Sequence, residues 1–508
     1  MADGTLTWKL IGIVSYLTIL LVIGIVASRR MKDLREYFAA GKSLNFWAVA
    51  FSARATGESA WLLLGLTGMG AVLGVRAFWV VLGEVIGVGG AWLLMSRRFK
   101  RLTDRYDSIT VPDYLESRFR DQSHYLRIVS AAALVVFVTI YVSAQIDATG
   151  KAFEMFLNWN YYAGALVGFA VVLVYITSGG FLAVAWSDVF QGALMFFGLV
   201  TLPLVAAQTT GGFGTVFNGL EKIDPSLLSL AGPSGWTSIS IAGAIGLSLI
   251  GLGFLGSPQI FVRFIAMRSE KEIPKGTAVA IVWTLLADSG AVLVGMIGRF
   301  LLDPNPTLTK LGSGGENVLP MLVEHTMPAV LIGLYIAIVL SAIMSTVDSL
   351  LVVASSACVR DWYQKVKHPE LPDDKLVGIS RKATVALALV ALLVAMGVAI
   401  TTPNRTIFWF VIFGWSGIAA TFCPTIILSL FWSKMTGKGA LAAMVTGFLA
   451  VPIFKFGVAN LPEIGPIFKA LEELPPSFAL SAIVGILVSL WDKAGQEKMQ
   501  GIAEELEG

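Results

Sequence analysis

The feature that most constrains this chain is a series of apolar runs, each close to 20 residues long. A helix of about 20 apolar residues crosses the ~30 Å hydrocarbon core of a bilayer. The chain is 56% hydrophobic and only 14% charged over 508 residues, whereas charged residues make up about 25% of a soluble domain. This composition excludes a disordered chain, a secreted disulfide-rich domain and an ordinary soluble enzyme. The sequence predicts an all-α membrane protein.

About thirteen transmembrane helices are predicted from these runs. The spans are residues 8–28, 44–72, 76–96, 127–155, 160–178, 185–206, 238–262, 276–300, 328–357, 382–401, 406–432, 438–457 and 476–492. Most of the 37 lysine and arginine residues lie in or beside the loops that follow odd-numbered spans. Because basic residues gather in cytoplasmic loops, we expect a multi-pass protein of the plasma (inner) membrane. Its N-terminus is expected outside and its C-terminus in the cytoplasm.

Two of the predicted spans are interrupted by residues that weaken a helix. The second span contains the run ARATGES, and the seventh contains GLGFLGSP. Unpaired backbone groups at membrane depth are tolerated only where they are buried in protein or line a cavity. Broken helices at matching places in two halves point to the binding site of a secondary transporter. We therefore predict one transporter domain over residues 1–508, with inverted repeats at 44–206 and 238–432; two kinked packing helices are the alternative.

The ninth span carries hydroxyl groups at its centre. Ser345 and Thr346 are adjacent, and Ala342 precedes Ser345 by one turn. Hydroxyl and carbonyl oxygens are hard ligands that suit a small cation. Alternatively, the hydroxyls bond back to their own helix or join neighbouring helices. We favour a cation site, because the freed carbonyl groups of the broken second span are expected to face this helix.

Ionisable side chains inside apolar spans are costly and mark functional sites by default. Glu58 lies within the break of the second span, where a purely structural role is hard to argue. Asp188 follows the Gly179–Gly180 turn, so capping of the next helix is an alternative role. Lys151 and Glu154 are able to pair with each other or to reach the membrane interface. The other ionisable residues of the predicted spans are Arg54, Glu84, Asp147, Asp288 and Asp348.

Two aromatic residues stand apart from the many that suit a lipid-facing surface. Trp61 follows the break of the second span by less than one turn, and Tyr141 lies in the middle of the fourth span near Gln145. A ring that covers a small bound solute would be placed in this way. Packing in the protein core is the alternative for both residues.

Several stretches together identify a family. They are Ser59–Leu66 (SAWLLLGL), Thr110–Tyr114 (TVPDY), Gly179–Asp188 (GGFLAVAWSD) and Met344–Thr346. The chain resembles the sodium/solute symporter family over nearly its whole length, and most closely the bacterial sodium/proline symporter branch. The resemblance implies a leucine-transporter-like fold, a 5+5 inverted repeat with one extra helix before it and two after.

The resemblance also implies a set of binding residues. A sodium site would lie between the second and ninth spans, with the carbonyls of Ala55, Glu58 and Ala342 and the hydroxyls of Ser345 and Thr346 as ligands. Some relatives bind a second sodium ion, whose matching residues here are Asp188, Ser345, Asp348 and Ser349. Substrate contacts would come from Gly57, Ser59, Trp61, Tyr141, Gln145, Phe254, Ser257 and Gln259.

The chain departs from the proline branch at two places near these contacts. The branch has Asp-Met where this chain has Gly57-Glu58, so a carboxylate has moved by one position. The branch also has a tryptophan just before the glycine run of the seventh span, where this chain has Ile250. The lost ring weakens the inference of proline itself, whereas the shifted carboxylate is able to alter coupling or to meet a cationic group on the substrate.

The expected function is secondary active symport, in which inward sodium flow drives uptake of a small organic solute, with proline or a related amino acid first. The open alternatives are a proton-coupled symporter that uses Glu58, a symporter of a cationic amine, and a non-transporting membrane sensor. An enzyme is not expected, since no nucleophile–base pair or metal cluster is visible in the sequence. The expected partners are sodium, the solute and the lipid bilayer, without nucleic acid.

Overall fold

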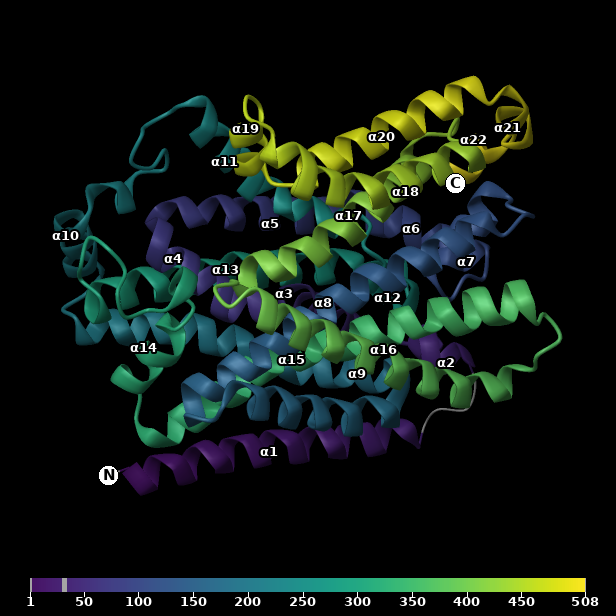
Figure 1. Ribbon diagram of the computed structural model, residues 1–508. Coiled ribbons are helices and arrows are strands. Elements are labelled where there is room, and N and C mark those ends of the chain that lie inside the picture. The colour runs from purple at the N-terminus through teal and green to yellow at the C-terminus, as the bar shows by residue number, and fades with distance from the viewer. Residues whose placement is uncertain (1, 30–33, 508) are drawn as a thin grey trace.

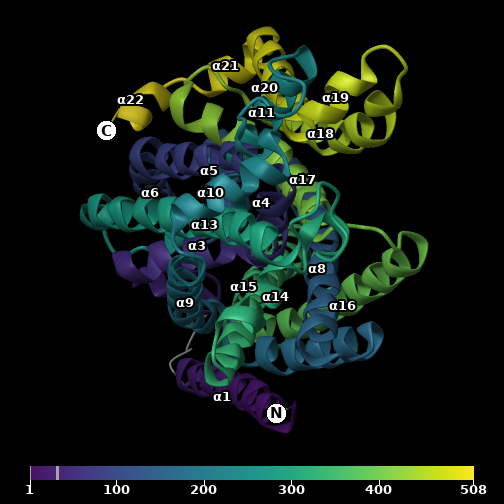
Figure 2. The same ribbon diagram turned by 90° about the vertical axis from the view of Figure 1, so that its left-hand side faces the viewer.

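The computed structural model describes residues 2–29 and 34–507 and shows a helical bundle. Within these ranges the chain forms no β-strand, and the bridge between Leu44 and Met267 is isolated. Long helices run roughly side by side, with the N-terminal helix along one edge and the C-terminal helices along the opposite edge (Figure 1). The view turned by 90° keeps the two ends of the chain on opposite flanks (Figure 2).

The helices follow the apolar runs closely. They are α1 (Ala2–Ser28), α2 (Leu34–Ala39), α3 (Phe46–Ala60), α4 (Thr67–Leu73), α5 (Phe78–Gly90), α6 (Ser96–Arg105), α7 (Val111–Phe119), α8 (Tyr125–Leu157), α9 (Tyr161–Thr209), α10 (Phe213–Ile223), α11 (Ser238–Leu249), α12 (Pro258–Ala266), α13 (Ile273–Leu302), α14 (Val318–Thr326), α15 (Ala329–Ser356), α16 (Asp373–Thr401), α17 (Ile407–Phe431), α18 (Gly437–Pro452), α19 (Gly465–Leu471), α20 (Leu474–Trp491), α21 (Lys493–Lys498) and α22 (Ile502–Glu507). Turns of π-helix at Trp61–Leu66, Ala91–Met95 and Ala357–Lys367 extend α3, α5 and α15.

Eleven helical stretches of the described residues are long and apolar enough to cross a membrane. One of them, Phe46–Arg105, is 60 residues long and covers the predicted spans 44–72 and 76–96. The predicted span 160–178 falls on a shorter apolar stretch, Tyr161–Leu173. The multi-pass helical architecture is therefore confirmed, whereas the count of thirteen stays a prediction.

Both predicted interruptions are confirmed as breaks in helical geometry. Ser59 has φ 39° and ψ −166°, which ends the regular part of α3 in the middle of its span. In the seventh span, α11 gives way to a 3₁₀ segment at Ile250–Leu255, and Gly256 has φ 156° before α12 begins at Pro258. A positive φ is the conformation that glycine adopts without strain. The backbone thus leaves helical geometry at each break.

Packing places the two breaks in the interior of the bundle. The broken helix α3 packs against α9, α13 and α15, while the 3₁₀ segment after α11 packs against α5 and α17. The N-terminal helix α1 covers α9 and α15 from outside, and α18 and α20 pack on each other at the opposite flank. The polar backbone groups freed by the breaks are therefore surrounded by protein, as non-helical backbone at membrane depth requires.

Close approach of two helices depends on Gly83 of α5. A Cβ added there would overlap the carbonyl group of Ser248 on α11. We expect Gly83→Ala to lower the free energy of unfolding by about 1–3 kcal/mol, as other overpacked cores do. Thermal melting of the purified protein in detergent measures the change.

The matched control for this substitution is Gly397→Ala on α16. An added Cβ meets no atom within 4 Å there, so the better helix propensity of alanine should stabilise by up to about 1 kcal/mol. Equal melting temperatures for the two variants would show that the contact between α5 and α11 is not tight.

Candidate ion and substrate site

Hydroxyl groups of α15 meet carbonyl groups of α3 next to the first break. Ser345 donates through Oγ to the carbonyl oxygen of Ala55 at 2.9 Å, and Thr346 donates through Oγ1 to that of Thr56 at 3.0 Å. The two hydroxyls also lie 3.2 and 3.3 Å from the carbonyl oxygen of Ala342. All five residues are at most 1% exposed. Two hydroxyl and three carbonyl oxygens therefore converge, which is a donor set that hard cations prefer.

The structure brings together four of the five residues that the resemblance implied as sodium ligands. These are Ala55, Ala342, Ser345 and Thr346. The fifth, Glu58, turns its carbonyl to the backbone N–H of Trp61. The carbonyl of Thr56 was missed, because its approach to α15 depends on how the two helices are rotated against each other.

Asp188 of α9 lies at the centre of a second polar group. Its Oδ2 accepts hydrogen bonds from Ser52 at 2.6 Å and Thr56 at 3.3 Å, and pairs with Nη2 of Arg263 at 3.0 Å. The same guanidinium nitrogen donates to Ser349 at 2.5 Å. The suggested capping role for Asp188 is wrong, because Gly180 marks the turn and Asp188 lies two helical turns further on.

Two of the four residues implied for a second sodium ion thus contact a protein cation. Asp188 and Ser349 both contact Arg263, while Asp348 is buried on α15. Arg263 was missed in the sequence because the predicted seventh span ended at residue 262. Extending the search for ionisable residues by one position would have found it.

The predicted substrate residues of the first break lie together. The side chain of Ser59 is 3.4 Å from the hydroxyl of Tyr141 and 3.3 Å from Nε2 of Gln145, both on α8. The Trp61 indole donates to the carbonyl of Gly57 at 3.0 Å. Since hydroxyl, amide and indole groups converge with freed backbone here, the break is suited to hold a small polar solute.

The second break meets the first through Phe254. A Cβ added at Gly57 would be 2.7 Å from the Phe254 ring, so only a glycine allows this approach. Ser257 points instead toward Cys423 on α17, with 3.8 Å between oxygen and sulfur. Gln259 is 1% exposed, and both polar atoms of its side chain lack a hydrogen-bond partner among the described residues.

Trp415 of α17 was not identified from the sequence, yet it covers the second break. Its indole donates to the carbonyl of Ile250 at 3.0 Å, and its ring lies 4.9 Å from that of Phe254. An aromatic ring therefore stands beside Ile250, where the proline branch has a tryptophan in the chain itself. No local sequence signal marks Trp415, because its role depends on a contact between segments 165 residues apart.

A charged network lies around Asp147, next to the site. Arg405 pairs with this carboxylate, which also accepts a hydrogen bond from Tyr161 at 2.6 Å. Lys151 pairs with Glu316 at 3.0 Å rather than with Glu154, so that alternative is wrong. Burial raises the pKa of Glu316 above its ordinary value, although Lys151 opposes the shift.

A second charged network joins α7, α8 and the extension of α15. The guanidinium of Arg127 pairs with Asp113 at 2.6 Å, Glu116 at 2.5 Å and Asp361 at 2.6 Å. Burial alone would raise the pKa of Asp113, but the neighbouring Arg127 and Arg360 outweigh it and hold that pKa below its usual range. This network ties α7 and α8 to the extension of α15, the helix that carries Ser345.

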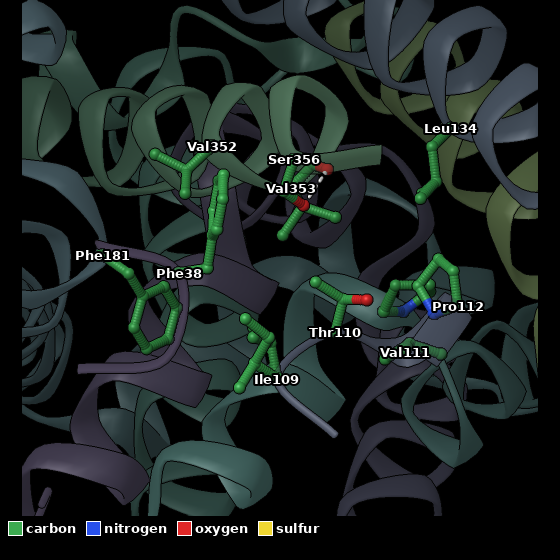
Figure 3. Close-up of a pocket in the computed structure, with 12 residues that line it drawn as sticks. Phe38, Ile109, Thr110, Val111, Pro112, Leu134, Phe181, Val352, Val353 and Ser356 are labelled. Atoms are coloured by element: carbon green, nitrogen blue, oxygen red, sulfur yellow. Dashed lines mark hydrogen bonds between the residues drawn. The ribbon is translucent and has the colours of Figure 1, made fainter. Parts of the chain in front are cut away.

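Next to this network lies a narrow apolar cavity of about 10 Å³ (Figure 3). Val352, Val353 and Ser356 of α15 lie on one side of it, and Ile109 to Pro112 lie on the other. Its wall includes Phe181, whose ring lies 5.0 Å from the guanidinium of Arg263. A space of this size holds one water molecule at most.

The family model described as "Sodium:solute symporter family" matches residues 37–447. The chain belongs to the sodium:solute symporter family. The "High-affinity proline transporter PutP" of Bacillus subtilis is 35% identical over 484 residues, which is 94% of this chain and 96% of the relative. The "Osmoregulated proline transporter OpuE" of the same organism is 32% identical, covering 97% of each chain. The "Sodium/proline symporter" of Escherichia coli is 32% identical, over 96% of this chain and 93% of its own.

Two solved structures share the fold of this symporter family member. A Na⁺-coupled sialic acid symporter in a substrate-bound outward-open state superposes with a TM-score of 0.76 at 17% identity, over 96% of this chain and 98% of the other. Mhp1, a nucleobase-cation-symport-1 family transporter in a closed conformation, gives a TM-score of 0.51 at 12% identity, over 93% of this chain and 98% of the other. The expected leucine-transporter-like fold is confirmed. Because the family and its relatives are transporters, an enzyme is excluded.

Proposed function

We propose that this family member couples the inward flow of sodium to the uptake of proline or a closely related amino acid. The observation that carries the proposal is the meeting of the Ser345 and Thr346 hydroxyls with the freed carbonyls of α3. These oxygens lie beside the first break, where the polar groups suited to a small solute converge. The relatives that are named proline transporters and a sodium/proline symporter supply the substrate class.

Sodium would act by holding α3 against α15. The Ser345 and Thr346 hydroxyls donate to carbonyls that would be ligands of the ion. A sodium ion at the same oxygens would join the two helices more strongly than these hydrogen bonds do, and would favour the state in which the substrate site opens outward. An ion shifts such an equilibrium only by its difference in affinity between the states.

The membrane potential would supply much of the driving force. One elementary charge that crosses 100 mV releases about 2.3 kcal/mol, which corresponds to a roughly fiftyfold ratio of substrate concentrations. Release of the substrate would then require the ion pairs of the Arg127 network to open, because the adjacent cavity of about 10 Å³ is too small for a solute. An N-terminus outside and a C-terminus in the cytoplasm of the plasma membrane would place this network on the cytoplasmic side.

Proline remains the first choice despite the departures at Gly57-Glu58 and Ile250. Trp415 puts an aromatic ring beside Ile250, which supports a small apolar ring as part of the substrate. The Glu58 carboxylate contacts Arg54, one turn back on α3, so a positive charge already stands beside it. The proton-coupled, cationic-amine and sensor alternatives are not favoured by these relatives.

One further feature stays part of the proposal. The inverted repeats at 44–206 and 238–432 would each begin with one of the broken helices. A second sodium ion at Asp188, Ser345, Asp348 and Ser349 is not favoured, because it would have to displace the guanidinium of Arg263 from its partners.

Uptake of radiolabelled proline into proteoliposomes tests the proposed function directly. With an inward sodium gradient and a negative interior, we expect accumulation well above the outside concentration. An equal potassium gradient should give only equilibration. Accumulation driven by a pH gradient without sodium would contradict the assignment of the coupling ion, and sodium-driven uptake of another amino acid but not proline would contradict the substrate.

A further inference from the structure

Three buried carboxylates, from α3, α5 and α13, meet on the side of α3 that packs against α13. We name Glu58, Glu84 and Asp288 the carboxylate cluster. One oxygen atom from each residue lies within 4.8 Å of the others. All three side chains are 0% exposed. The site described above does not use these carboxylates, since that site takes its oxygens from carbonyls and hydroxyls.

One guanidinium accompanies the cluster. Arg54 contacts Glu58 one turn further along α3 and lies 3.6 Å from Glu84. Its guanidinium also stands over the rings of Phe254 and Trp283, at 4.7 and 5.5 Å from their centres. In their ionised forms, the three carboxylates and the one guanidinium would sum to a net charge of −2 inside a membrane domain. Burial of uncompensated charge costs several kcal/mol for each ion, so such carboxylates either take up protons or bind a further cation.

Hydrogen bonding does not relieve the charge. Within residues 2–29 and 34–507, neither oxygen of Glu84 or Asp288 accepts a hydrogen bond. The guanidinium of Arg54 contacts Glu58 and lies 3.6 Å from Glu84, so it offsets one negative charge only. Asp288 is the clearest case, because its carboxylate points into the cluster and neither oxygen has a partner there. Buried polar groups are normally satisfied. A fully buried, unpartnered carboxylate aimed at two others points to a site suited to bind a cation.

The spacing of the oxygens fits a hard cation. Calcium, whose radius is close to that of sodium, takes oxygen ligands at about 2.3–2.6 Å. Two ligands on opposite sides of such an ion are therefore up to about 5 Å apart, and the cluster oxygens lie within 4.8 Å of one another. We propose that Glu58, Glu84 and Asp288 bind a second sodium ion. This inference rests on the proposed sodium symport.

The position of this site explains what the second ion would do. The oxygens of Ala55 and Thr56 join α3 to α15, whereas Glu58 faces α5 and α13. Two ions would thus hold α3 from two sides. Arg54 links the cluster to the second break by its contact with Phe254. Both polar groups hold one guanidinium, but Arg263 contacts the single carboxylate of Asp188, whereas Arg54 accompanies three carboxylates.

Equilibrium binding of ²²Na⁺ to the purified full-length protein in nanodiscs tests the inference without relying on transport. We expect the wild type to bind two sodium ions and Asp288→Asn to bind one. Glu84→Gln is the second variant, for use if Asp288→Asn does not run as a single monodisperse species. The matched control is Glu473→Gln, because Glu473 is 1% exposed and pairs with Lys455 at 3.0 Å, away from the cluster. It should still bind two ions.

The outcomes separate this inference from the proposed function. A wild type that binds one sodium ion, which Ser345→Ala loses and Asp288→Asn keeps, would overturn the second site alone. Unchanged sodium binding in both cluster variants, with a loss of proline affinity only, would assign the cluster to the substrate and overturn the inference as well. A wild type that binds no sodium would overturn the proposed coupling ion together with this site.

Discussion

Replacing Ser345 with alanine is expected to raise the sodium concentration for half-maximal uptake by about 10- to 100-fold. The hydroxyl donates to the Ala55 carbonyl at 2.9 Å and would become an ion ligand when sodium binds. An interaction between a charged and a polar group contributes about 1.5–3 kcal/mol, which gives this range. Thr346→Ala should behave in the same way, because its hydroxyl meets the Thr56 carbonyl. Sodium titrations of proline uptake measure the shift.

Ser355→Ala is the matched control on the same helix. Its hydroxyl bonds back to the carbonyl of Val352 at 3.0 Å, as serines in helices commonly do. The sodium dependence of this variant should equal that of the wild type. If Ser345→Ala and Thr346→Ala also keep the wild-type sodium affinity, the site between α3 and α15 is refuted.

The second large effect concerns the buried pair of Arg263 and Asp188. Arg263→Gln should lower the free energy of unfolding by about 3–5 kcal/mol, because it leaves a buried carboxylate without its cation. Both residues are 0% exposed and stand 3.0 Å apart. The double variant Arg263→Gln, Asp188→Asn should recover most of this loss, since no unpaired charge remains. Melting temperatures of the wild type, the two single variants and the double variant complete the cycle.

A double variant no more stable than Arg263→Gln alone would contradict this account. In that case the guanidinium would stabilise the protein through its hydrogen bonds to Ser349 and Thr56 rather than by neutralising Asp188. Uptake assays on the double variant add a second readout. A stable double variant without transport would show that the charges serve the transport cycle as well as the fold.

The sequence predicted the elements whose signals are local. Apolar runs of membrane length located the helices, and the residues around Ser59 and Gly256 located the two breaks, because positive φ values and freed carbonyls follow from nearby residues. The adjacent hydroxyls of Ser345 and Thr346 pointed to a cation site for the same reason. The family resemblance then placed Ala55 and Ala342 beside them.

What could not be predicted depends on how distant helices meet. Trp415 covers the break at Ile250 from another helix, and the Thr56 carbonyl faces α15 only because of the rotation of α3. Glu84 and Asp288 are more than 200 residues apart, so the sequence marked each as costly without showing that they share a cluster. Lys151 paired with Glu316 of a loop rather than with its helical neighbour, because side chains near a helix end reach several partners.

The small cavity near α7 has an electrical consequence. A cavity of about 10 Å³, lined mostly by apolar side chains, has no room for a continuous column of water, and a dry region has a low dielectric constant. We expect much of the transmembrane voltage to fall across such a region. An ion that reaches the oxygens of Ser345 from the opposite end would already have crossed part of the field, so its affinity would change with voltage. A dry region near α7 would also prevent sodium from crossing the protein without the substrate.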